Sequence, residues 1–251
     1  QHIMKKTFIT LLALAGVAMG ADKTIDLATQ KWNIGYGTEL TDGVLTFNAA
    51  GWGVNLSSLA LDSISLDKNQ VLTLSVTHNY NTYDTLFTMA LVNESGAVVM
   101  GQSFSNEVRF ATTTETGDSV KRGYAFGGTN NSDQVANITE GYVTLKKEGS
   151  ESSMQYAPNS GSTVKDNVSV LTVAYNQQKE KFVATLTYDN VSNSITLGDT
   201  FTVDSIAATF TGDTKTSVTA MSLSVATVPE PTTATLSLLA LAGLAARRRR
   251  K

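Results

Sequence analysis

The chain has 251 residues, with 19 Lys and Arg, 22 Asp and Glu, and no cysteine. The lack of cysteine excludes disulfides, thiol nucleophiles, and zinc or iron–sulfur sites built on thiolates. Only two histidines occur, and His2 lies in a terminal segment that we expect to be removed. A metal site built on several histidines is therefore excluded, and a Ser-His-Asp mechanism would depend on His78.

The first elements of the chain predict export. Two lysines follow Met4, an apolar stretch covers residues 8–17, and small residues come next. This order is typical of a secretory signal peptide. The stretch is too short to cross a hydrocarbon core, which needs about 20 apolar residues. We therefore expect residues 1–20 to be a signal peptide, with residues 1–3 upstream of its start.

The body of the protein is expected to be residues 21–227. Without the terminal segments it carries 12 Lys and Arg against 21 Asp and Glu, a net charge of about −9. This acidic balance makes nucleic acid and anionic lipid poor partners for the body. Its length fits a single domain, because all-β domains of about 200 residues are commonly undivided.

Short runs rich in Val, Leu, Thr, Phe and Tyr fill this body, and Gly, Asn, Asp and Ser interrupt them every 8 to 13 residues. That spacing predicts an antiparallel sandwich or barrel. One turn of helix is expected at Leu56–Ala60. The predicted strands, in chain order, are Val44–Asn48, Gly53–Leu56, Ser63–Leu66, Val71–Thr77, Leu86–Val92, Val98–Phe104, Val108–Thr113, Gly123–Phe126, Gly141–Lys147, Val168–Tyr175, Phe182–Tyr188, Ile206–Thr211 and Thr219–Val225.

Alternation and turn chemistry support these strands. Leu72, Leu74 and Val76 fall on one face of their strand by the two-residue period. Asn93-Glu94-Ser95-Gly96 predicts a hairpin between two apolar strands, and Tyr188-Asp189-Asn190 predicts a second turn. Residues 113–122 and 148–166 are rich in Ser, Thr, Gly and Asn and are expected to be exposed loops, where sandwiches place binding functions.

The number and spacing of these strands, and the run from Val71 to Gln102, resemble the concanavalin A-like jelly roll, of which laminin-G-like domains are one branch. The resemblance implies an all-β fold of two antiparallel sheets.

No catalytic carboxylate pair is evident along the predicted strands. A glycosidase needs two carboxylates about 5 to 9 Å apart, and jelly-roll glucanases place them as alternating Glu and Asp along one strand. The nearest groupings, Glu148 with Glu151 and Glu115 with Asp118, fall in polar loop sequence and are expected to be solvated charges. We therefore predict a protein that is not an enzyme.

Metal binding has a weak sequence basis. Oxygen ligands for calcium could come from Asp84 with Asn79 and Asn81, or from Asp199 with Asp204. Neither group has the spacing of a calcium loop, and turn-forming Asp and Asn explain both. The prediction is no metal and no cofactor, with calcium as the alternative.

One segment has the composition of a sugar-binding loop. Residues 78–84 combine two tyrosines with amide and carboxylate groups, and tyrosine rings stack on the apolar face of a pyranose. An ordinary polar hairpin loop fits the same sequence, and Trp32 and Trp52 fit core or rim packing. The candidate glycan-binding residues are His78, Asn79, Tyr80, Tyr83, Asp84 and Trp52.

The last two dozen residues have a three-part order. Val228-Pro229-Glu230-Pro231 precedes an uncharged Leu- and Ala-rich segment at 232–246, and Arg247-Arg248-Arg249-Arg250-Lys251 end the chain. The basic cluster would stay on the cytoplasmic side of a membrane, although 15 apolar residues form only a marginal span. This order resembles the PEP-CTERM sorting tail of Gram-negative bacteria, which implies recognition and cleavage by a membrane enzyme of the exosortase type. An ordinary C-terminal tail anchor is the alternative.

Together these features predict a bacterial exported protein with an all-β body at 21–227, terminal signal and anchor helices, and a sorting and membrane segment at 228–251. We expect it at the cell envelope, on the cell surface or outside the cell, as a surface or extracellular-matrix protein without catalytic activity. The alternatives are a carbohydrate-binding module that contacts extracellular polysaccharide, and a glycosidase or lyase with an unrecognised site.

Overall fold

The computed structural model describes residues 22–35, 37–48, 51–80, 86–102, 108–113, 124–126, 136–138, 143–145, 164–212 and 216–228. The expected signal peptide and the apolar C-terminal segment lie outside these residues. Within the described ranges, no helix has the length and apolar character needed to cross a membrane.

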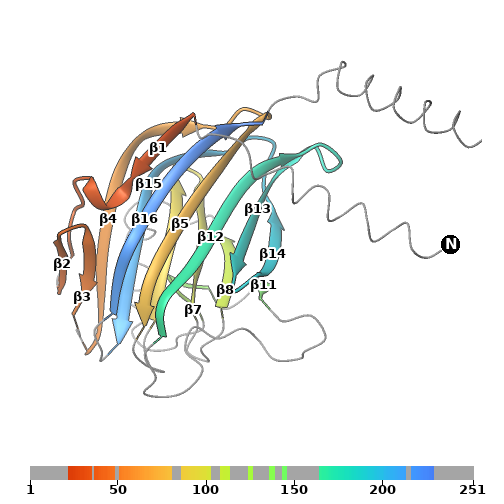
Figure 1. The fold of residues 1–251 in the computed structure, drawn as a ribbon. Coiled ribbons are helices and arrows are strands. Elements are labelled where there is room, and N and C mark those ends of the chain that lie inside the picture. Colours follow the sequence, from red (N-terminus) through yellow and green to blue (C-terminus); the bar gives the residue numbers. More distant parts are fainter. Residues whose placement is uncertain are drawn as a thin grey trace, which may run out of the picture.

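Two antiparallel sheets form the body (Figure 1). The eight-stranded sheet runs in the order β14 (Val191–Thr196), β13 (Lys181–Tyr188), β12 (Val164–Asn176), β5 (Gln70–Tyr80), β16 (Thr216–Thr227), β3 (Val44–Phe47) and β2 (Thr38–Thr41), with β1 (Lys23–Asp26) also pairing with β16. The six-stranded sheet runs in the order β11 (Val143–Thr144), β8 (Val108–Thr113), β7 (Gly96–Gln102), β6 (Leu86–Asn93), β15 (Thr202–Gly212) and β4 (Gly51–Ser65).

The core lies between these sheets and follows the two-residue period of the strands. Leu72, Leu74 and Val76 of β5 are fully buried, which confirms their predicted common face. Leu171 and Val173 of β12 continue the same layer on the neighbouring strand. The remaining large buried side chains include Phe47, Phe110, Phe182, Leu27 and Leu45.

Both predicted turns are confirmed. Asn93 pairs with Gly96 where β6 turns into β7. Asp189 and Asn190 join β13 to β14 with φ angles of 46° and 61°, respectively. Positive φ at both central residues is the mark of a type I′ turn, whose twist matches the twist of the flanking strands.

The helical turn expected at Leu56–Ala60 is wrong, because these residues lie inside the long strand β4. β4 pairs with β15 from Gly51 to Ser65, so pairing with a distant strand overrides the local sequence. Ser57 can face the core because its hydroxyl accepts a hydrogen bond of 3.1 Å from the Gly35 main-chain N–H. Two strands predicted separately are therefore one.

The predicted loop at 148–166 is also partly wrong. β12 begins at Val164, and its pairing with β5 shifts register between Val164 and Asn167. Asp166 sits in this irregularity with a φ of 54°. Its main-chain N–H donates a hydrogen bond of 2.9 Å to the side-chain oxygen of Asn79, which fixes the bulge to β5.

The outer face of the six-stranded sheet is covered over β6, β7, β8 and β15, whereas Ala60 and Asp62 of β4 are exposed. Ala90, Val99, Ala111 and Ala207 alternate with the core residues of their strands, yet all four are buried. The short strand β9 (Tyr124–Phe126), which pairs in parallel with β10 (Ala136–Ile138), lies against β6 and β7. The outward side chains of the eight-stranded sheet are, by contrast, half-buried or exposed.

Candidate functional site

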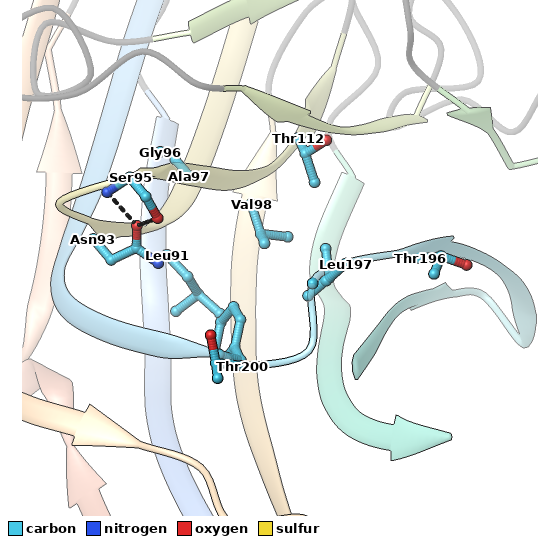
Figure 2. Close-up of a pocket in the computed structure, with 12 residues that line it drawn as sticks. Leu91, Asn93, Ser95, Gly96, Ala97, Val98, Thr112, Thr196, Leu197 and Thr200 are labelled. Atoms are coloured by element: carbon cyan, nitrogen blue, oxygen red, sulfur yellow. Dashed lines mark hydrogen bonds between the residues drawn. The ribbon is translucent and has the colours of Figure 1, made fainter. Parts of the chain in front are cut away.

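A pocket of about 410 Å³ opens at one end of the sandwich (Figure 2). One wall comes from the β6–β7 hairpin, through Leu91, Asn93 and the run from Ser95 to Val98, together with Thr112 of β8. The other wall comes from the end of β14 and its connection to β15, through residues 196–198, 200 and 201. Asp199 belongs to the same connection, but it is paired with Lys181 and does not line the pocket. The two walls meet because β15 pairs with β6, although they are a hundred residues apart in the chain.

The lining divides into apolar and polar parts. Leu91, Val98 and Phe201 are buried and Leu197 is half-buried, so they give the pocket an apolar floor. Ser95, Thr112, Thr196 and Thr200 are exposed and bring hydroxyl groups to its rim. None of the twelve lining residues is charged.

Asn93 holds the two walls together. Its side-chain amide donates a hydrogen bond of 2.8 Å to the main-chain carbonyl of Thr202, at the start of β15. Its side-chain oxygen accepts bonds of 2.8 Å from both the main-chain N–H and the hydroxyl of Ser95 (Figure 2). The hairpin wall is therefore fixed to the start of β15, which directly follows the other wall, before any ligand arrives.

The other wall is fixed to the eight-stranded sheet. The Leu197 N–H donates to the Phe182 carbonyl at 2.8 Å, and the Phe182 N–H donates to the Gly198 carbonyl at 2.9 Å. Phe182 packs edge-on against Tyr175, with ring centroids 5.4 Å apart, and its ring lies 6.4 Å from that of Phe201. The pocket thus rests on the aromatic part of the core.

This combination suits a neutral ligand with one apolar face and several hydroxyl groups. Its volume lies in the range of about 300 to 1,000 Å³ that is typical of small-molecule sites. Hydroxyl groups can donate and accept hydrogen bonds, so the rim matches a ligand rich in hydroxyls. An ionised ligand would find no opposite charge among the twelve described lining residues.

His78 is placed differently from the sequence expectation. It was expected in a loop, but β5 continues through Tyr80 and His78 faces the core with 1% of its surface exposed. Its Nε2 lies 3.5 Å from the Ser169 hydroxyl. Burial lowers the pKa of the His78 imidazole from 6.5 to about 3, so the ring is neutral at neutral pH and turned away from solvent.

The other residues of that segment separate into two groups. The Asn79 side chain links β5 to both neighbouring strands. Its nitrogen donates a hydrogen bond of 3.3 Å to the Ser217 hydroxyl of β16, and its oxygen accepts one from the Asp166 main-chain N–H of β12. Tyr83 and Asp84 lie outside the described residues, as does Asn81. Tyr80 lies in β5, and Trp52 lies in β4.

Trp32 belongs to the core, as predicted. Its indole N–H donates a hydrogen bond of 2.8 Å to the Leu27 carbonyl, and 7% of its surface is exposed.

The two carboxylates of the second calcium candidate each have another partner. Asp199 forms an ion pair with Lys181, and Asp204 accepts a hydrogen bond of 2.9 Å from the Ser205 hydroxyl. In the described part of the chain, no three His, Asp or Glu side chains gather as a set of metal ligands. The acidic pairs near 115–118 and 148–151 lie outside it.

The sorting motif begins where the body ends. Val228 directly follows β16, and its main-chain N–H donates a hydrogen bond of 2.7 Å to the Asn69 carbonyl. Pro229, Glu230, Pro231 and the basic cluster lie outside the described residues. The first residue of the motif is therefore hydrogen-bonded to the body.

Sequence reasoning did not find the pocket. It predicted the Asn93–Gly96 hairpin but gave no role to residues 196–201. Their Thr, Gly and Asp are typical of any loop between two strands. No pattern in the sequence links the two segments, because the link is the pairing of β6 with β15.

Residues 227–251 match the family described as the PEP-CTERM protein-sorting motif. This confirms the resemblance that the tail suggested. No curated protein sequence matches the chain.

Solved structures resemble the body in fold. An endo-1,3-beta-glucanase from Streptomyces sioyaensis has a TM-score of 0.50 and 9% identity, covering 85% of this chain and 98% of its own. The Emp46p carbohydrate recognition domain has a TM-score of 0.45 and 13% identity, covering 82% and 97%. A legume lectin-like domain from Entamoeba histolytica has a TM-score of 0.45 and 11% identity, covering 80% and 92%. The fold that the body shares with the glucanase is a two-sheet all-β sandwich, as the sequence predicted.

Proposed function

We propose that this chain, with its PEP-CTERM tail and concanavalin A-like body, is an exported surface protein that binds a neutral carbohydrate without catalysis. In this proposal, residues 1–20 direct export and the tail is processed by an exosortase-type membrane enzyme. The segment at 232–246 holds the chain at the membrane until then. The body then presents its pocket outside the cell.

The observation that carries the binding proposal is the uncharged pocket, with its apolar floor and hydroxyl rim. A pyranose has an apolar face and a ring of hydroxyls, so both parts of the pocket have a counterpart on the ligand. Phe201 is the aromatic residue of the floor. The rigid walls held by Asn93 favour binding, because little ordering is needed when the ligand enters.

The lining also favours binding over catalysis. Glycoside hydrolysis needs two carboxyl groups on either side of the scissile bond, and Asp, Glu and His do not occur among the twelve described residues that line this pocket. A surface or matrix protein without any ligand is the first alternative. A glycosidase or lyase with a site elsewhere is the second, and the fold of the glucanase keeps it open by analogy.

The test is a calorimetric titration of the purified protein with neutral oligosaccharides, beginning with linear 1,3-β-glucan fragments. Thr200→Trp places a large ring on the exposed rim and should weaken binding at least tenfold by filling the pocket. Gln177→Trp, in the exposed β12–β13 turn, is the matched control and should bind like the wild type.

Equal affinity in all three proteins would contradict this pocket as the site. Release of shorter oligosaccharides during the titration would contradict the non-catalytic part of the proposal and favour the enzyme alternative.

A further inference from the structure

A row of hydroxyl groups crosses the outer face of the eight-stranded sheet. The registers place one Ser or Thr at the same level on six neighbouring strands, β1, β16, β5, β12, β13 and β14. These strands lie side by side in Figure 1. In strand order the residues are Thr24, Ser224, Thr73, Thr172, Thr185 and Ser194.

The neighbouring rows are made of similarly small side chains. One contains Ser222, Ser75, Val170, Thr187 and Ser192, and the other contains Ala226, Val71, Ala174, Val183 and Thr196. Charged residues make up 16% of the chain, yet none occurs in these rows on β16, β5, β12, β13 and β14. Asp26, on β1 at one border, is the nearest carboxylate in register with them.

Several of these hydroxyls already bond to one another. The Thr185 and Ser194 hydroxyls lie 2.8 Å apart, as do those of Thr187 and Ser192. The Thr172 hydroxyl donates to the Thr185 carbonyl at 3.4 Å. Polar groups that keep a hydrogen bond within the protein lose less free energy when water is removed. This face is therefore easier to dehydrate than a face of charged side chains.

The face is also open and partly apolar. Val168 of β12, next to these rows, is 46% exposed, which makes it the most exposed large hydrophobic residue in the described part of the chain. On the other sheet the outward residues Ala90, Val99, Ala111 and Ala207 are buried, whereas the outward residues of these rows are half-buried or exposed. The short side chains have few rotamers to lose when they are covered.

We propose that this face, called here the hydroxyl face, is a self-association surface on which two copies of the chain pack sheet against sheet. Five strands about 4.8 Å apart and about seven residues long give roughly 550 Å² per copy. Two copies would bury about 1,100 Å², which clears the roughly 1,000 Å² expected of a specific interface. Twisted sheets pack face to face in this way inside β-sandwiches.

A second copy fits the hydroxyl face better than a glycan does. Each hydroxyl both donates and accepts, so the rows are complementary to themselves. Glycan binding would gain from exposed aromatic rings, and the rows contain none. The body carries about −9 net charge, and the rows on β16, β5, β12, β13 and β14 contain no carboxylate, so two copies can meet there with little repulsion.

The test uses single cysteines, because the chain has no cysteine of its own. Ser75→Cys, Thr172→Cys and Thr185→Cys place one thiol at three points of the hydroxyl face in the full-length protein. Gln177→Cys, in an exposed turn, is the matched control. After mild oxidation, we expect a disulfide-linked dimer from at least one of the three variants, or from a mixture of two of them, and none from the control.

Sedimentation of the full-length protein gives the second measurement. Thr172→Lys would place two like charges in the interface and should weaken self-association about 100-fold or more. Gln177→Lys should leave it unchanged, and both variants share the same tail. A wild type that stays monomeric and gives no cross-link above the control would overturn the proposal. So would binding of a glycan to the hydroxyl face that Thr172→Lys abolishes without any change in oligomeric state. Neither result depends on ligand binding in the pocket.

Discussion

Asn93 and Thr202 are joined by a hydrogen bond of 2.8 Å from the side-chain amide of one to the main-chain carbonyl of the other. This bond ties a hairpin of the six-stranded sheet to the loop that returns from the eight-stranded sheet. It therefore sets the width of the pocket, and it gives the first prediction.

Asn93→Ala should lower the free energy of unfolding by about 1 to 2 kcal/mol, because it removes this bond and the two that Ser95 donates to the same side chain. Ser95→Ala is the matched control, since it removes one exposed hydrogen bond to Asn93, leaves the other two and should cost less than about 0.5 kcal/mol. Urea denaturation measures both. Equal stability of the two variants would show that the Asn93 side chain does not hold the walls.

The buried imidazole of His78 predicts acid sensitivity. Its pKa is about 3 in the folded protein and 6.5 in the unfolded chain, so the unfolded state binds more protons below pH 6.5. Stability is fully present above pH 6.5 and is lost as the pH falls towards 3. Between pH 7 and pH 4 this loss should be about 3 kcal/mol.

The measurement is urea denaturation at several pH values, compared with His78→Gln. Carboxylates contribute equally to the pH dependence of both proteins, so the difference between the curves isolates His78. The variant should be less sensitive to acid. Parallel curves would mean that His78 does not remain neutral in the folded state.

Phe182 packs beneath the floor of the pocket, so its replacement should lower the free energy of unfolding strongly. Phe182→Ala should cost about 3 to 5 kcal/mol, because it leaves a cavity between Tyr175 and Phe201. Phe182→Leu keeps most of the volume and should cost clearly less. Thermal denaturation compares them, and a loss below 1 kcal/mol for the alanine variant would contradict the packing described.

The sorting motif predicts the fate of the chain in its host. Replacing Pro229, Glu230 and Pro231 with alanine should leave an unprocessed, membrane-associated form. Replacing Thr232 and Thr233 is the matched control and should allow normal processing. Cell fractionation and intact mass distinguish the forms, and identical processing of both variants would argue against recognition of the motif.

Strands with strong alternation could be predicted from the sequence. β5 and β13 were found because buried and outward residues alternate along them, as in Leu72, Leu74 and Val76. The same alternation continues to His78, so extending the predicted strand by one residue would have predicted its burial. β14 was missed because its apolar residues, Val191 and Ile195, are few and only half-buried at a sheet edge.

Features set by distant pairing could not be predicted in this way. β4 is continuous because β15 pairs along its whole length. The pocket exists because β15 also pairs with β6, which brings Thr200 near Asn93. The hydroxyl row likewise depends on the registers of six strands, and each of its members alone is an ordinary outward Ser or Thr.

The central claim is that the pocket binds a neutral carbohydrate. The most direct test measures binding of the wild-type protein and of Thr200→Trp to a broad glycan array, with calcium and with a chelator. The account predicts binding to one class of neutral glycan, lost in Thr200→Trp and unchanged by the chelator. Binding to acidic glycans alone, or no binding to any glycan in either condition, would contradict it and favour a surface protein without a carbohydrate ligand.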